Sequence, residues 1–226
     1  MKPKNLLTVT LLMLTTAAFS QNLSMGPRLG ATMTKFGGLD DASYKPGLTG
    51  GVFLVYSKRE HSGLGMELIY SGEGSKYEYT RVSGGTTTKH EHNTRLNYLR
   101  IPFHATYFFA NAGDKIRPKI SLGPSVGFLM SVKDRATVTR TTNGNTTVEK
   151  PVHTSLKDYS RLDIGLALST GLNYKLMSRT WLNVDLRYYY GFIDFVKNNA
   201  YPNDYVNNKG ASLSLGLAWG IDKPKN

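Results

Sequence analysis

Apolar and polar residues alternate one by one through much of the chain after residue 20. The clearest case is 211–219, where Leu213, Leu215, Leu217 and Trp219 take every second position and small or polar residues take the others. Successive side chains of a strand point to opposite faces, so this period of two predicts β-strands. The same pattern, stronger or weaker, occurs in 26–36, 47–57, 63–73, 96–109, 119–132, 161–174 and 181–193. The sequence therefore predicts an all-β chain of eight strands.

The connections between these predicted strands differ in length at the two ends. Short connections follow the second, fourth and sixth strands; longer ones follow the first, third, fifth and seventh, the longest being 74–95 and 133–158. Antiparallel strands in even number, with short periplasmic turns and long extracellular loops, are typical of a transmembrane β-barrel of the outer membrane. Gly84-Gly85 and Asn143-Gly144 supply the positive φ angles of two-residue hairpin turns. We therefore expect both long connections to continue as β-hairpins beyond the membrane.

The non-apolar face of the predicted strands decides between a membrane barrel and a soluble, lipocalin-like barrel, because both alternate. Those positions are mostly Gly, Ala and Ser, whereas a water-facing sheet would favour Thr, Lys and Glu. Small residues fit the crowded interior of an eight-stranded barrel. We therefore predict that this face lines the lumen and that the apolar face meets lipid.

A few charged residues and one histidine interrupt the predicted lumen face. They are Arg28, Glu67, Arg100, His104, Asp163, Asp185 and Arg187. A charge buried without a partner is costly, so the presence of both signs favours a structural network of salt bridges over a proton or ion path. An eight-stranded lumen is also too narrow for a solute pore.

Aromatic residues gather toward the two ends of the predicted strands. Those toward the long-loop end are Tyr188, Tyr190 and Phe192, and those toward the short-turn end are Tyr107, Phe109, Tyr174 and Trp219. Aromatic girdles mark both membrane–water interfaces of such barrels. We therefore predict that these seven residues lie at the two interfaces.

The first part of the chain has the character of a secretory signal peptide covering residues 1–20. Two lysines precede a short apolar stretch, Leu6–Leu14, and Ala18–Ser20 supplies small residues for cleavage. The alternative is an N-terminal membrane anchor, for which the apolar stretch is short. We predict export, a single barrel domain over 21–226, and location in the bacterial outer membrane.

Several segments together carry a family resemblance. They are Leu96–Pro102, Arg161–Gly165 with Gly171-Leu172, and Arg187-Tyr188 with Gly191 followed by Gly210–Trp219. In order and spacing they resemble the PorT-like outer-membrane β-barrel proteins, over essentially the whole mature chain. The resemblance implies a barrel of about eight strands and, for the namesake group, an association with protein secretion, but no chemistry. Barrel proteins commonly end on an aromatic residue, whereas here further residues follow Trp219.

Composition narrows the possible functions. The 226 residues include no Cys, which excludes disulfides, thiolate metal sites and a lipoprotein anchor. A mean hydropathy of −0.32 is compatible with a membrane barrel, because only alternate residues meet lipid. The 28 Lys and Arg exceed the 16 Asp and Glu, giving a formal charge of +12. Export makes nucleic acid an unexpected partner for this charge, so we predict none.

Much of the positive charge falls on the predicted long-loop side. The basic residues there are Lys76, Arg81, Lys89, Arg95, Lys133, Arg135, Arg140, Lys150, Lys157, Lys197 and Lys209. Acidic residues assigned to the same side are Glu73, Glu78, Glu91, Asp134, Glu149 and Asp158. The cations are suited to the phosphates of outer-membrane lipid, including lipopolysaccharide, or to an acidic envelope protein. A merely solvated loop surface is the other interpretation, and the sequence leaves both open.

Motifs for chemistry are lacking in the sequence. His90-Glu91-His92 lies in a predicted long loop, where two histidines without a third ligand indicate a solvated segment rather than a metal site. There is no phosphate-binding loop, nucleophile elbow or zinc-protease motif. We therefore expect no catalytic residue, metal or cofactor, and interpret the protein as a non-enzymatic outer-membrane barrel that displays extracellular loops for envelope-lipid or protein contacts. The alternatives are an accessory barrel of a secretion system, a lipid-modifying outer-membrane enzyme, and a soluble carrier of an apolar ligand.

Overall fold

The computed structural model describes residues 22–39, 41–57, 59–194 and 205–221, and the predicted signal peptide lies outside them. The strands are β1 (Leu23–Gly37), β2 (Ser43–Tyr56), β3 (Ser62–Ser83), β4 (Thr86–Phe108), β5 (Ile116–Thr142), β6 (Asn145–Glu149), β7 (Val152–His153), β8 (Leu162–Met177), β9 (Thr180–Gly191) and β10 (Asn207–Gly220).

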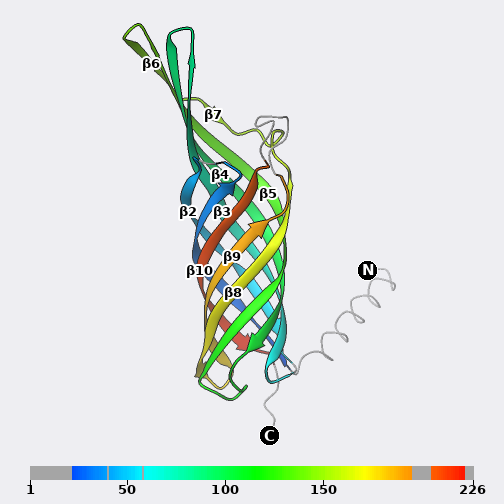
Figure 1. Cartoon of the computed structure of the whole chain (residues 1–226). Coiled ribbons are helices and arrows are strands. Elements are labelled where there is room, and N and C mark those ends of the chain that lie inside the picture. The colour runs from blue at the N-terminus through cyan, green and yellow to red at the C-terminus, as the bar shows by residue number, and fades with distance from the viewer. Residues whose placement is uncertain (1–21, 40, 58, 195–204, 222–226) are drawn as a thin grey trace, which may run out of the picture.

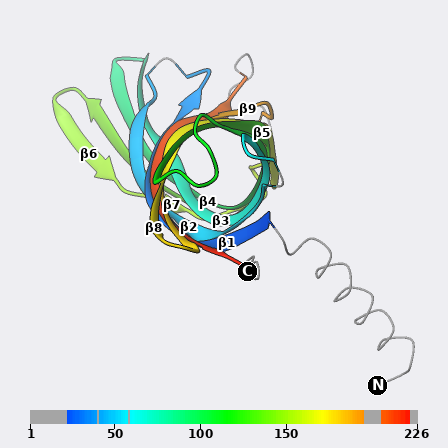
Figure 2. The same ribbon diagram turned by 90° about the horizontal axis from the view of Figure 1, so that it is seen from below.

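Eight of these strands close into a ring. Each pairs antiparallel with its neighbours in the order β1-β2-β3-β4-β5-β8-β9-β10, and β10 returns to β1. Figure 2 shows the ring from below, and Figure 1 shows it from the side. The predicted fold class, an eight-stranded antiparallel barrel, is confirmed. The two additional strands, β6 and β7, pair with β5 outside the ring.

The two ends of the barrel differ as the sequence indicates. Short connections join β2 to β3, β4 to β5 and β8 to β9 at one end, where Met25 near the start of β1 pairs with Trp219 near the end of β10. At the other end β3, β4 and β5 continue far past the ring (Figure 1). The predicted longer connection after the first strand is wrong, because β1 and β2 both extend and leave only 38–42 between them.

The predicted hairpins are confirmed at both turns. Gly84 and Gly85 join β3 to β4 with φ of 56° and 74°, and Asn143 and Gly144 join β5 to β6 with φ of 49° and 82°. Positive φ at both central positions gives the turn a twist that matches the flanking strands. The long connections are therefore mostly strand, and we call the β3–β4 and β5–β6 hairpins beyond the ring the two extensions.

The β2–β3 pairing contains an irregularity at the long-hairpin end. The register shifts between Tyr44 and Thr49, across a stretch that includes Pro46, which has no backbone N–H to donate. From β1, Thr32 and Thr34 donate side-chain hydrogen bonds to the carbonyls of Gly72 and Gly74 in β3, at 2.7 and 2.9 Å. These bonds stabilise the sheet where its ladder is broken.

Apolar side chains cover the outside of the ring. Leu29, Leu48, Leu64 and Leu213 are each more than half exposed, whereas most buried residues of the ring are polar or charged. A surface of this kind suits hydrocarbon, and a closed ring leaves no unpaired strand edge inside it. Among the described residues, no helix has the length and apolar character needed to cross a membrane.

One apolar cluster lies inside the barrel, toward the long-hairpin end. It consists of Phe36, Ala42, Leu96, Tyr98, Leu129, Val132 and Val206. Leu96 and Tyr98 are fully buried. This cluster was not predicted, because a second register shift, beside Asn97 and Tyr98, changes which residues of β5 face inward.

Candidate functional site

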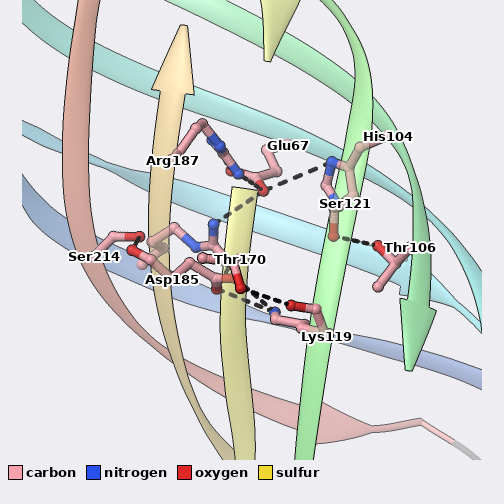
Figure 3. A network of polar contacts seen from close by, with 10 residues as sticks. Glu67, His104, Thr106, Lys119, Ser121, Thr170, Asp185, Arg187 and Ser214 are labelled. Carbon is pink, nitrogen blue, oxygen red and sulfur yellow. Dashed lines mark hydrogen bonds and ion pairs between the residues drawn. The ribbon is translucent and has the colours of Figure 1, made fainter. Parts of the chain in front are cut away.

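The predicted lumen residues meet first in a network centred on Glu67 of β3 (Figure 3). Arg187 of β9 donates to both carboxylate oxygens of Glu67, with Nη2–Oε1 at 2.6 Å and Nη1–Oε2 at 3.0 Å. Arg28 of β1 adds a third bond, from Nη1 to Oε1 at 3.1 Å. The side chains of Glu67 and Arg28 are buried, so these are charge-assisted bonds away from bulk water.

Asp185 of β9 extends this network, which we call the lower network because it borders the cavity at the short-turn end. Its Oδ2 accepts from Nη2 of Arg28 at 2.8 Å, and its Oδ1 lies 2.9 Å from Nζ of Lys119. Arg28 therefore bridges two carboxylates. Lys119 was missed from the sequence, although the alternation that places Ser121 and Ser125 in the lumen puts Lys119 on the same face.

His104 is a neighbour of the lower network rather than part of it. Its Nδ1 lies 3.9 Å from Oε1 of Glu67, which is too long for a hydrogen bond. Figure 3 shows its ring beside Ser121 and directed toward Glu67, which lies on the neighbouring strand β3.

An upper network surrounds Arg100 of β4. Its Nε and Nη2 donate to the two oxygens of Glu73 at 2.5 and 2.7 Å, and Nη2 also donates to Oδ2 of Asp163 at 2.7 Å. Asn208 donates to the same Asp163 oxygen at 3.1 Å, and the guanidinium lies 4.0 Å from the ring centre of Tyr189. The sequence interpretation placed Glu73 among the external loop charges, and this was wrong. β3 continues past Glu73, and the alternation of its side chains directs Glu73 into the lumen, where it is buried.

The two networks balance in charge and close the lumen. The cations are Arg28, Arg100, Lys119 and Arg187, and the carboxylates are Glu67, Glu73, Asp163 and Asp185. Within the described residues, a cavity of about 490 Å³ below them extends to the short-turn end, and the void between them measures about 40 Å³. The interior is therefore a vestibule open at one end and blocked by ion pairs, with the apolar cluster beyond.

The three residues His90, Glu91 and His92 do not form a loop, contrary to the prediction, because β4 runs through them. His92 stacks on Tyr77 with ring centres 4.6 Å apart, and its Nδ1 lies 2.9 Å from Asp134, itself buried rather than external. Glu91, one residue away in the strand, instead pairs with Lys89. Strand alternation thus divides the motif between two faces. Within the described residues, no three His, Asp or Glu side chains gather as metal ligands.

The predicted interface aromatics lie on the outside of the ring, at the two ends. Tyr107, Phe109, Tyr188, Tyr190, Phe192 and Trp219 are exposed, and Tyr174 is partly buried. Tyr107 and Phe109 contact edge to face at 5.3 Å, and Tyr190 lies 5.9 Å from Phe192 at the opposite end. Their contact with lipid headgroups stays a prediction.

The comparison with protein families agrees with this geometry. Residues 19–197 match the family described as outer membrane protein beta-barrel domain. The chain belongs to this family. It is therefore a β-barrel of the bacterial outer membrane, whose ring strands cross the bilayer. The narrower resemblance to PorT-like proteins stays a prediction.

Solved structures of outer-membrane barrels are similar in fold. Neisserial surface protein A is 17% identical, with 87% of this chain and 96% of that chain covered and a TM-score of 0.45. OprG of Pseudomonas aeruginosa is 10% identical, with 88% and 95% covered and a TM-score of 0.48. Ail of Yersinia pestis is 12% identical, with 88% and 99% covered and a TM-score of 0.38. Among curated proteins, none matches the sequence.

Proposed function

We propose that this protein is a non-enzymatic outer-membrane barrel that serves as a rigid base for two extracellular extensions, which contact outer-leaflet lipid, lipopolysaccharide included, or an envelope protein. The observation that carries the proposal is the contrast between a lumen blocked by ion pairs and strands that continue far beyond the ring. Export by removal of residues 1–20, leaving 21–226 as the barrel domain, is part of the same proposal.

The blocked lumen supports an anchoring role. Every carboxylate of the two networks has at least one cation within 3.1 Å, so the charges are engaged with one another. Buried ion pairs of this kind hold register and exclude solutes, because separating them exposes an uncompensated charge. We therefore assign the lumen residues a structural role rather than catalysis or transport.

The extensions have the order expected of a binding surface. β3, β4, β5 and β6 form one continuous sheet above the ring (Figure 1). Tyr79 stacks on His90 with ring centres 4.6 Å apart, and the hydroxyls of Thr86 and Thr142 lie 2.8 Å apart near the β4–β5 tips. A surface that is already ordered loses less conformational entropy when it binds, which favours affinity.

Shortened extensions test this function. Tyr77 pairs with His92 and Val138 with Glu149, so replacing 78–91 and 139–148 each by Asn-Gly closes both hairpins in register. The full chain and the shortened variant are purified in mild detergent from the native envelope, and co-purifying lipids and proteins are identified. We expect the shortened variant to lose partners that the full chain retains. Identical sets of lipids and proteins would contradict the proposal, and recovered secretion components would support the accessory role implied by the PorT-like resemblance.

A further inference from the structure

A pocket rich in cations lies at the base of the extensions, outside the lumen. Its volume is about 260 Å³, many times the space of roughly 30 Å³ that one water occupies. The residues that line it are Lys45, Pro46, Lys76, Asn93, Arg95, Lys133 and Arg135. We call it the outer basic pocket. Five cationic side chains and no carboxylate line it.

Strand register explains why these cations converge. Lys76 of β3 is opposite Asn93 of β4, which is opposite Arg135 of β5, while Arg95 is opposite Lys133. Alternate residues of a strand share a face, so the β4 and β5 members all lie on the face opposite buried Thr94 and Asp134. Neighbouring strands are about 4.8 Å apart, which leaves the side chains in reach of one ligand.

Lys45 enters the pocket from the irregular stretch of β2. It is only 7% exposed, and its ammonium donates to Oδ1 of Asn93 and, at 3.1 Å, to the carbonyl of Thr94. Both acceptors are neutral. The carboxylate of Asp134 attracts this cation through space, but Arg95, Lys76 and Arg135 repel it more strongly, so an anion in the pocket would lower the cost of burying it.

Nearby carboxylates are engaged elsewhere. Asp134 accepts from His92 and Thr94, and Lys89 holds both Glu78 and Glu91 at 3.0 and 2.7 Å. In the described part of the chain, no ion pair involves any of the five cations of the outer basic pocket. Among the described residues, the five cations of the pocket therefore have no carboxylate in direct contact.

The level of the pocket points to a lipid source for the anion. Tyr44, next to Lys45, is half exposed, and Lys35 lies 5.1 Å from the centre of its ring. Lys35 of β1 is opposite Lys209 of β10, and Lys209 is opposite Tyr190 of β9. Tyr190 belongs to the aromatic girdle predicted at the long-loop end. Because aromatic girdles lie at headgroup depth, the pocket adjoins the phosphates of the outer leaflet.

We propose that the outer basic pocket binds a phosphate group of an anionic lipid of the outer leaflet. This rests on the proposed function and assigns its lipid contact to particular residues. Guanidinium groups bind phosphate oxygens in pairs, and lysine ammonium groups add charge, so Arg95 and Arg135 would hold the phosphate with Lys45, Lys76 and Lys133 around it.

Charge-matched variants test the site. Lys76→Gln, Arg95→Gln and Arg135→Gln are combined in one variant, and Arg81→Gln, Arg140→Gln and Lys150→Gln, which change exposed residues farther out, form the control. Each protein, in zwitterionic micelles, is titrated with phosphorylated lipid A and with its dephosphorylated form, and binding is followed by native mass spectrometry. We expect the pocket variant to bind phosphorylated lipid A at least about tenfold more weakly than wild type, and the control about as well as wild type.

Several outcomes would overturn the inference. These are equal losses in both triple variants, which indicate general charge attraction, and equal binding of the dephosphorylated lipid. Displacement by inorganic phosphate at the same concentration as the lipid would show a free-anion site instead. A second measurement uses Lys45→Met, which keeps the packed length without the charge. We expect it to melt higher than wild type in lipid-free micelles and to gain less stability from lipid A; unchanged melting in both conditions would contradict the role of Lys45.

The two proposals fail separately. The shortened variant retains the outer basic pocket, so normal lipid A binding by this variant supports the pocket, and unchanged partners in the same variant would contradict the role of the extensions alone. Normal lipid A binding by the pocket variant would contradict the pocket alone and leave the role of the extensions standing.

Discussion

Arg187 and Glu67 join opposite walls of the barrel. They lie on β9 and β3, which are four strands apart in either direction around the ring, and their two hydrogen bonds of 2.6 and 3.0 Å therefore span the lumen. A bidentate pair in this position fixes the distance between the walls as well as the charge balance. The lower network therefore acts as a cross-brace of the barrel.

Neutralising the centre of this brace should destabilise the barrel. Glu67→Gln leaves Arg28 and Arg187 buried beside an amide that cannot balance their charge, and we expect a loss of about 3–5 kcal/mol in the free energy of unfolding. Urea unfolding in micelles measures it, with the exposed Glu149→Gln as the control. A Glu67→Gln barrel as stable as the control would show that the brace contributes nothing to stability.

Strand alternation alone located part of the lumen networks. It placed Arg28, Arg100 and Asp185 on the inward face, because period two fixes the side of a strand on which a residue lies. It could not follow how far β3 keeps that alternation, so Glu73 was assigned to the outside. Partners also depend on which strands are across the ring from one another, as Arg187 and Glu67 are, and this relation follows from closure and not from any local pattern.

The irregularity in β2 is the clearest feature that the sequence could not predict. The pattern of 47–57 indicates a strand, but the register shift between Tyr44 and Thr49 follows from contacts with β1 and β3. That shift is what brings Lys45 to the outer basic pocket. A basic residue beside Pro46 gives no sign of this in the sequence.

A charge on the lipid face should oppose membrane assembly. Leu166 in β8 is 40% exposed on the outer face, opposite Tyr190. Leu166→Arg places a cation on the lipid face at the level of Tyr190 in the aromatic girdle, so we expect a cost below the about 2–4 kcal/mol of a midplane position. Folding into lipid vesicles, read by the mobility shift between folded and unfolded barrel, measures it against Leu166→Met. Equal folding of both variants would show that this face does not meet lipid.

The blocked lumen predicts one-sided access for a water-soluble thiol reagent. The protein has no Cys, so single substitutions give an unambiguous readout. Asn173 lines the cavity that extends to the short-turn end, whereas Ser125 is 1% exposed beside the void between the networks. We expect Asn173→Cys to react rapidly and Ser125→Cys to react only after unfolding. Rapid labelling of both would mean that solvent passes the upper and lower networks.

His90, which stacks on Tyr79 in the β3–β4 extension, makes this extension sensitive to mild acid. Burial first, then His92, Arg81 and Arg140, lower the pKa of His90 below its ordinary value, because the stacked ring beside Tyr79 takes up a proton less readily than a free one. The unfolded hairpin takes up a proton at His90 more readily than the folded one, so falling pH favours unfolding. The stability of the hairpin is therefore fully present above the ordinary pKa of about 6.5 and decreases as pH falls below it. Amide hydrogen exchange at pH 7.5 and pH 5.5, corrected for intrinsic rates, should show faster opening of the hairpin in acid. His90→Phe retains the stack without a titrating group, so we expect it to reduce this difference, whereas an undiminished difference would show that His90 is not its cause.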